Sequence, residues 1–193
     1  WYNETANTLK FQYENTAGAW STGGSMNTAR DLLGGAGSQT SSLVFGGEPY
    51  PSVSALTEAY NGSSWTEVSD LNTARFLLGG VGADNTAVLA FGGNPSYKAN
   101  TESWDGTSWT EVADLNTGRW AMAGNAGTQP AALLFGGATS PSTVANTESW
   151  NGSAWTEVAD LNTAREENAG AGTSTSALSI AGTPSYPTAT AVV

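Results

Sequence analysis

One eleven-residue string recurs along the chain at nearly constant spacing. Trp-Thr-Glu-Val-x-Asp-Leu-Asn-Thr-x-Arg begins at Trp65, Trp109 and Trp155, and a degenerate copy begins at Trp20. The steps between these tryptophans are 45, 44 and 46 residues. A period of this size is typical of one supersecondary unit copied along the chain, each copy covering the apolar face of its neighbour. The repeat therefore predicts the architecture before any single residue is interpreted.

The composition is typical of a secreted or virion-surface protein. The chain has 193 residues with 24 Gly and 8 Trp, and 17 acidic residues against 6 basic ones give a net charge of −11. This charge repels phosphate backbones and anionic lipid surfaces, so we expect neither nucleic acid nor a membrane as a partner. No apolar run approaches the ~20 residues that a membrane helix needs, and we expect no membrane insertion.

Cysteine and histidine are both absent. Their absence removes thiolate nucleophiles, the commonest general base and the commonest transition-metal ligands. Most acidic residues recur in every copy, which favours a structural role for them. We therefore expect no enzyme, no metal and no cofactor. The chain begins at Trp1, and we expect a processed product or the ordered part of a longer polypeptide.

Each period reads as four short strands without helical spacing. In the copy that follows Arg75 we expect strands over 76–81, 86–91, 101–104 and 109–112. Asp105-Gly106 and the equivalent Asn61-Gly62 and Asn151-Gly152 lie between the last two strands, and such pairs are strong hairpin signals. Each period is thus predicted to form a four-stranded antiparallel meander.

This unit resembles the kelch repeat over residues 20–193. The resemblance rests on the double glycine after the second strand, an aromatic residue before the hairpin, a tryptophan after it, and an Arg that opens the next copy. Four residues separate the two aromatics, fewer than is usual for kelch, which shortens the outer hairpin. The carriers are Gly46, Gly47, Gly92, Gly93, Gly136, Gly137, Tyr60, Trp104, Trp150, Trp65, Trp109 and Trp155. The resemblance implies an all-β fold, a β-propeller with blades around a central channel.

The number of blades depends on how the last copy is completed. We expect blades over about 30–68, 75–112, 119–158 and 165–193, but the last copy ends before its outer strands. Residues 10–20 read as the missing hairpin, so we expect the N-terminal segment 1–19 to close a ring of about four four-stranded blades. Two alternatives stay open: two or three chains share blades, or a half-open ring docks on another subunit.

The first eleven residues carry a narrower resemblance. The string from Trp1 to Phe11 looks like a Trp-Tyr-Asn … Leu-Lys hairpin of bacteriophage tail-fibre and appendage proteins. The Ala/Gly/Thr-rich copies that follow are similar to kelch-like arrays in structural proteins of marine phages. The resemblance implies a virion-surface or extracellular location and a homo-oligomer.

The arginines, one per blade, allow two interpretations. Arg30, Arg75, Arg119 and Arg165 form either a ring of guanidinium groups that binds anions or a set of ion pairs that pin adjacent blades. The partners in the second case are the repeated glutamates 58, 102 and 148, or 67, 111 and 157. We expect ion pairs, because a residue present in every copy is better explained by structure.

Residues that break the repeat are the better candidates for binding. Trp65, Trp109 and Trp155 recur, so we expect them to pack in the core. Trp120 follows Arg119 where the other copies have Asp31, Phe76 and Glu166. The candidate ligand-binding residues are Trp120 and Arg119 together with Tyr50 and Tyr97, which lie in loops that vary between copies.

The aspartates that precede Leu-Asn-Thr are expected to cap turns. Asp70, Asp114 and Asp160 lack the dense Asp/Asn spacing of a calcium loop. A side chain that caps a turn is the more common role for such residues.

Two functional hypotheses follow. The first is a non-enzymatic propeller of a virion appendage, which uses loops 48–56, 94–99 and 138–145 to contact a host surface or another virion subunit. The second is a secreted bacterial lectin or adhesin that binds a glycan through the same loops. The first predicts a stable homo-oligomer and the second a monomer that binds sugar unaided.

Overall fold

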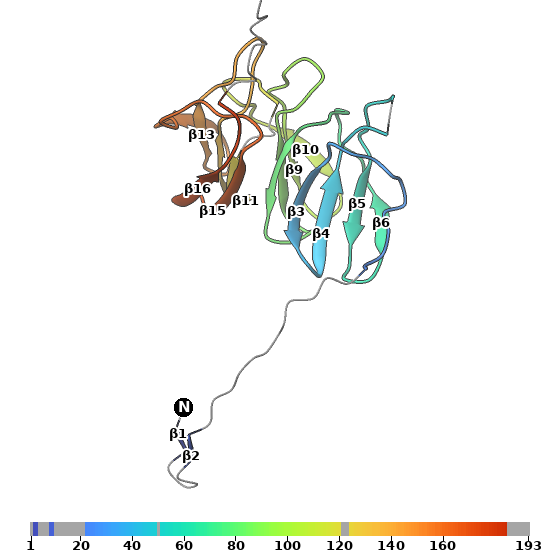
Figure 1. Cartoon of the computed structure of the whole chain (residues 1–193). Helices are drawn as coiled ribbons and strands as arrows, with labels where there is room; N and C mark the ends of the chain where they lie inside the picture. Colours follow the sequence, from blue (N-terminus) through green and yellow to red (C-terminus); the bar gives the residue numbers. More distant parts are fainter. Residues whose placement is uncertain (1, 4–7, 10–21, 50, 121–123, 185–193) are drawn as a thin grey trace, which may run out of the picture.

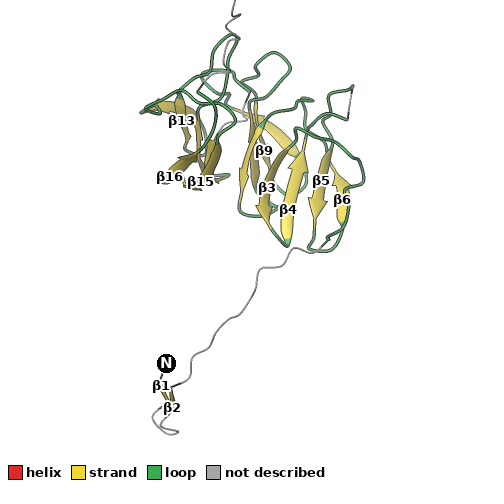
Figure 2. Cartoon of the chain, viewed as in Figure 1, coloured by secondary structure: helices red, strands yellow, loops and turns green. Residues whose placement is uncertain are grey.

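The computed structural model describes residues 2–3, 8–9, 22–49, 51–120 and 124–184. These residues form an all-β structure of antiparallel sheets (Figures 1 and 2). They contain no helix that is long and apolar enough to cross a membrane. Residues 10–20 and 185–193, on which the expected closure of the last blade depends, lie outside the described residues.

Three sheets have the same four-stranded meander order, and we call them blades 1 to 3. Blade 4 is the two-stranded sheet that follows them, and β1 pairs only with β2. The strands before the blades are β1 (Tyr2–Asn3) and β2 (Thr8–Leu9). Blade 1 comprises β3 (Gly34–Ser38), β4 (Ser41–Phe45), β5 (Thr57–Tyr60) and β6 (Trp65–Val68). Blade 2 comprises β7 (Gly79–Gly82), β8 (Val88–Phe91), β9 (Thr101–Trp104) and β10 (Trp109–Val112). Blade 3 comprises β11 (Gly124–Thr128), β12 (Ala131–Phe135), β13 (Thr147–Trp150) and β14 (Trp155–Val158), and blade 4 comprises β15 (Ala169–Thr173) and β16 (Ser176–Ile180).

The expected strands agree best with the structure in the outer half of a blade. The predicted bounds 101–104 and 109–112 are those of β9 and β10. The hairpin between them turns at Gly106, which has φ of +96°. The first strand was predicted to begin at Phe76 but begins at Gly79. Leu77 has φ of +53° and donates its N–H to Leu32 O of blade 1, which keeps residues 76–78 out of the sheet.

The innermost strands of the four blades pack against one another in chain order. β3 contacts β7, β7 contacts β11, and β11 contacts β15. Together they line one open cavity of about 220 Å³, whose walls are mostly glycine and alanine. The absence of large side chains lets these backbones approach closely. The inner strands of the four blades therefore lie side by side along one cavity.

The apolar cores lie between neighbouring blades. One joins Leu43 and Phe45 of blade 1 to Val88 and Trp109 of blade 2, and a second joins blade 2 to blade 3 in the same way. Trp109 meets Phe45 edge to face at 5.1 Å, and Trp155 meets Phe91 at 5.1 Å. Stability therefore depends on blade-to-blade contact, as in other stacked repeats.

The expected burial of the repeated tryptophans is confirmed for two of the three. Trp109 is 6% exposed and Trp155 is 5% exposed, whereas Trp65 is only half buried. The indole N–H of Trp65 donates to Gly24 O at 3.0 Å. Trp109 and Trp155 each face a preceding four-stranded blade, whereas the described residues contain no such blade in front of Trp65.

Glycines at the start of the inner strands provide a test of this packing. A Cβ on Gly79 would overlap the ring of Phe91, while a Cβ on Gly35 would meet its nearest atoms at 3.7 Å. We expect Gly79→Ala to lower the free energy of unfolding by about 1–3 kcal/mol through overpacking. Gly35→Ala, the matched control in β3, should leave it unchanged or raise it slightly. Urea unfolding measures both, and equal effects would contradict the assignment of Gly79 to a tight contact.

Candidate functional site

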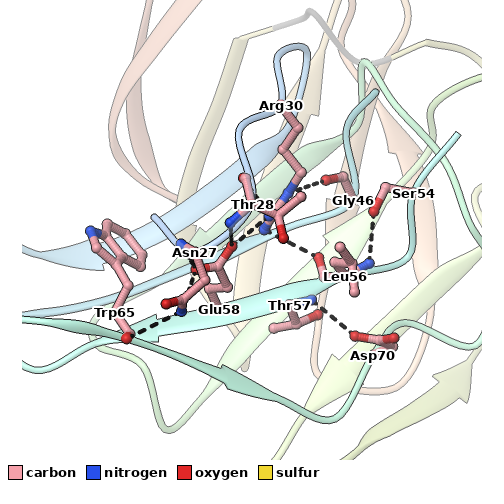
Figure 3. Close-up of polar contacts among 10 residues, drawn as sticks. All are labelled: Asn27, Thr28, Arg30, Gly46, Ser54, Leu56, Thr57, Glu58, Trp65 and Asp70. Atoms are coloured by element: carbon pink, nitrogen blue, oxygen red, sulfur yellow. Dashed lines mark hydrogen bonds and ion pairs between the residues drawn. The ribbon is translucent and has the colours of Figure 1, made fainter. Parts of the chain in front are cut away.

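The most extensive polar cluster in the described residues surrounds Glu58 on β5 (Figure 3). Its carboxylate accepts the backbone N–H of Asn27 at 2.7 Å and the side-chain amide of Asn27 at 3.0 Å. It also accepts the backbone N–H of Thr28 at 3.4 Å and Arg30 Nη1 at 2.6 Å. Arg30 Nε donates in turn to Gly46 O at 2.9 Å. We call this arrangement the clasp.

The clasp recurs in the next two blades. Arg75 lies 3.2 Å from Glu102, and Arg119 lies 2.7 Å from Glu148. Asn72 and Asn116 repeat both hydrogen bonds of Asn27, with their backbone N–H groups at 2.7 Å from the respective glutamates. The side chains of all six charged residues are at most 1% exposed. The expected Arg–Glu pairing is thus confirmed for three arginines, with the first of the two proposed glutamate sets.

The clasp segment is anchored to the preceding blade as well. In the segment 70–75, Asp70 accepts the backbone N–H of Thr57 at 3.1 Å, and Leu71 donates to Ala55 O at 3.0 Å. Arg75 O accepts the N–H of Gly47 at 2.9 Å, while its guanidinium binds blade 2. Gly47 has φ of +100°, a conformation that favours glycine. One short segment therefore ties two successive sheets together.

The aspartates act differently from the expected turn caps. Asp70, Asp114 and Asp160 each accept the backbone N–H of a residue thirteen positions earlier, at 3.1–3.2 Å. Each therefore fixes the start of the third strand of its own blade. Within the described part of the chain, no three acidic residues are grouped so that they could hold a metal ion.

Burial and hydrogen bonding act in opposite directions on the charges of the clasp. Burial disfavours the ionised Glu58, but the backbone N–H groups of Asn27 and Thr28 and the Arg30 guanidinium outweigh it and lower the pKa of Glu58. Burial lowers the pKa of Arg75 and of Arg119, and the charges of Glu102 and Glu148 oppose this effect. A buried pair of this kind fixes geometry, and either charge left alone would be costly.

The fourth arginine has a different environment. Arg165 is half buried, and its Nη1 donates to Ala181 O at 3.1 Å and to Gly182 O at 3.2 Å. In the earlier blades the glutamate comes from the third strand. Blade 4 has no third strand among the described residues, so the described structure contains no equivalent glutamate position for Arg165.

The residues that follow the arginines lie at equivalent positions at one end of the blades. Asp31, Phe76, Trp120 and Glu166 each form a bridge to the residue after a double glycine or its counterpart, namely Glu48, Asn94, Ala138 and Thr183. These bridges border the variable loops between the second and third strands. The four positions are thus structurally equivalent, and at one of them the side chain is the indole of Trp120.

Trp120 lies beside one of the two tyrosines proposed for ligand binding. The rings of Tyr97 and Trp120 meet edge to face with centroids 6.4 Å apart, and both side chains are half buried. Ser96 and Tyr97 have φ of +71° and +50°, which the repeat does not explain. The indole N–H of Trp120 is buried and has no hydrogen-bond partner in the described part of the chain.

The other two candidate ligand-binding residues are placed differently. Arg119 is 0% exposed and bound to Glu148, so its guanidinium is inaccessible to a ligand, and its assignment as a ligand-binding residue was wrong. Burial in the clasp is the physical reason. Tyr50 lies outside the described residues.

Sequence reasoning missed the contribution of asparagine and threonine. Asn27, Asn72 and Asn116 each join the glutamate to a backbone carbonyl of the following strand. Thr57 and Thr101 accept the indole N–H of Trp109 and Trp155 at 3.1 and 3.0 Å. Both residue types recur in every copy, and that recurrence was the available signal, but it does not reveal the partner.

Removal of one clasp arginine should be costly. Arg119→Leu leaves Glu148 buried without its ion-pair partner, and we expect a loss of about 3–5 kcal/mol in the free energy of unfolding. Arg165→Leu is the matched control, because Arg165 is half buried and its guanidinium donates to the backbone carbonyls of Ala181 and Gly182. Its loss should stay below about 1.5 kcal/mol. Thermal and urea unfolding of both variants test this, and similar losses would contradict the clasp.

Stability should depend on pH through Glu58. Its pKa is lowered in the folded protein, so the unfolded chain binds more protons between that pKa and the ordinary value of about 4.3. The stabilisation is present above about pH 4.3 and is lost as pH falls through the lowered pKa. We expect the difference in unfolding free energy between wild type and Glu58→Gln to shrink over this range. Glu67→Gln, at an exposed position on β6, is the control; a difference that does not vary with pH would contradict the prediction.

Comparison with known proteins provides no relative on which function could be based. No protein-family model matches the chain, and no curated protein matches its sequence. The conclusions on function therefore depend on the contacts described above.

Proposed function

We propose that the chain is a non-enzymatic kelch-like propeller of a virion appendage, such as a tail fibre or a surface decoration. The ring has about four blades, and the N-terminal segment completes the last one. Its work is to hold variable loops in fixed positions for contact with a host surface or another virion subunit. The proposal places the protein at the virion surface, as a homo-oligomer.

This proposal rests on one observation: the repeated polar residues make contacts within and between the blades. The clasps engage three arginines and three glutamates in buried ion pairs, namely Arg30, Arg75 and Arg119 with Glu58, Glu102 and Glu148. The repeated aspartates and threonines are engaged in fixing strands and tryptophans. Because these residues hold successive blades together, their charges are already paired. This arrangement favours binding through the loops over acid–base chemistry.

The alternative is a secreted lectin or adhesin, and one observation favours it. Tyr97 and Trp120 place two half-buried aromatic rings beside a variable loop. Aromatic rings of this kind offer large contact area at low entropic cost. The clasps leave no free guanidinium in blades 1 to 3, and the net charge is −11, so the ligand class that fits is an uncharged glycan.

The native mass discriminates between the two functions. Multi-angle light scattering of the full chain should give a discrete multiple of the chain mass if the protein is an appendage subunit. A monomer that binds sugar unaided would support the lectin and overturn the appendage. A monomer without sugar binding would leave neither function supported.

Glycan binding is tested on an array of neutral oligosaccharides. We expect Tyr97→Ala to weaken any binding about tenfold, which corresponds to the loss of about 1.4 kcal/mol of aromatic contact. The control is Val53→Ala, because Val53 is 37% exposed in the equivalent loop of blade 1. Circular dichroism checks that both variants fold. Unchanged binding by Tyr97→Ala would remove the aromatic pair from the candidate site.

A further inference from the structure

Each of the two complete contacts between successive blades contains a seat for an indole ring. In the first, Trp109 of blade 2 packs on Phe45 of blade 1 at 5.1 Å and donates its N–H to Thr57 Oγ1 at 3.1 Å. In the second, Trp155 packs on Phe91 at 5.1 Å and donates to Thr101 Oγ1 at 3.0 Å. The phenylalanine and the threonine are directly paired on adjacent strands in both cases. This pair defines the seat.

Blade 3 carries the same pair, and a cavity lies over it. Phe135 pairs with Thr147 on β12 and β13. A cavity of about 210 Å³ is lined by Leu133, Phe135, Thr147 and Leu161 of blade 3, with Ala177 and Ser179 of blade 4. An apolar cavity of about 150 Å³ is enough to bind benzene, so this one has room for an aromatic side chain. The Thr147 hydroxyl donates a long hydrogen bond of 3.5 Å to Ala145 O, which leaves its oxygen able to accept an N–H.

The other face of β16, which carries the side chains that alternate with Ala177 and Ser179, is more exposed than its counterpart in blade 1. Leu178 and Ile180 of β16 are 66% and 47% exposed, whereas Leu43 and Phe45 at the same positions of β4 are 0% exposed. Val158, at the end of β14, is 42% exposed. In β4 the equivalent residues pack against the following blade, so this face of β16 lacks such a neighbour among the described residues.

The register of the clasp identifies the occupant. The repeated tryptophan stands seven residues before an Asn of the clasp, and that Asn binds the glutamate of the following blade. Trp65 precedes Asn72, which binds Glu102 of blade 2, and the seated Trp109 precedes Asn116, which binds Glu148 of blade 3. Trp20 precedes Asn27 by the same seven residues, and Asn27 binds Glu58 of blade 1. By this register, the segment that carries Trp20 is assigned to the blade before blade 1.

In a ring that blade is blade 4. β15 contacts β11 of blade 3, and β15 lines the same cavity as β3 of blade 1. A tryptophan on the outer strand of a blade points back at the preceding blade, as Trp109 and Trp155 do. For a strand of blade 4, the preceding blade is blade 3, which carries the Phe135–Thr147 pair beside the cavity.

We propose that the cavity over Phe135 and Thr147 is the binding site of the Trp20 indole, with its N–H donated to Thr147 Oγ1. This inference rests on the proposed ring closure. It names the side-chain contact that locks the N-terminal segment of the chain to its last blades. The occupant is thus a segment of the same chain, and the bound group is an indole.

The test follows the indole N–H groups of the full-length chain by nuclear magnetic resonance. Trp20→Phe assigns the Trp20 signal among the eight tryptophans. We expect the Trp20 N–H to exchange with solvent slowly, and we expect the same of the buried, hydrogen-bonded Trp109 N–H. Thr147→Val should accelerate exchange at Trp20 about fivefold, the effect of one lost hydrogen bond, and leave Trp109 unchanged. Thr57→Val, the matched control, should do the reverse, and Thr147→Ser should restore slow exchange at Trp20.

Three outcomes would overturn the inference. Exchange of the Trp20 N–H at the rate of a free indole would show that the seat is empty. Slow exchange that Thr147→Val does not change would show that Trp20 is buried elsewhere, which rejects the seat while leaving ring closure intact. Slow exchange that appears only at high protein concentration would assign the seat to a second copy of the chain. The native mass, measured in parallel, tests the proposed function independently of this result.

Discussion

The buried glutamate of each blade is the point on which the rest of the structure depends. Glu58, Glu102 and Glu148 sit on third strands, and each gathers two backbone N–H groups, an asparagine amide and a guanidinium from the segment that enters its blade. That segment is simultaneously hydrogen bonded to the blade before it. A carboxylate that is only 1% exposed has lost its hydration, and hydrogen bonds and an ion pair must offset that cost. These contacts therefore fix the position of one sheet relative to the next.

The clasp explains why the apolar cores lie between sheets. Once successive sheets are held in register, Trp109 and Trp155 reach the phenylalanine and threonine of the preceding blade, and the inner glycine-rich strands meet along one cavity. Polar and apolar contacts thus enforce the same geometry, which is the local and global consistency expected of a foldable sequence. The loops that follow the second strands anchor the clasp segment through their last residues, as Ala55 O does for the N–H of Leu71, and their remaining residues differ between blades.

Much of the fold could be predicted from local patterns. The Asn61-Gly62 hairpin, the double glycines and the bounds of β9 and β10 follow from turn chemistry and strand alternation. The start of β7 could not be predicted, because the positive φ of Leu77 serves a bond to Leu32 in another blade. The inaccessibility of Arg119 likewise depends on Glu148, twenty-nine residues away. Of the candidate site, the sequence indicated the uniqueness of Trp120 but not its contact with Tyr97.

The sequence by itself determined the repeat length, the turn positions and the outer strands of each copy, and the residue types that had to find partners: one arginine, several acids and a tryptophan per period. Only the tertiary structure decided which glutamate each arginine meets and which tryptophans are covered. Trp65 and Trp109 begin the same string, yet Trp65 is half buried and Trp109 is 6% exposed. The reason is physical: burial and ion pairing are properties of the contact between sheets, and identical strings acquire different environments when their neighbours differ.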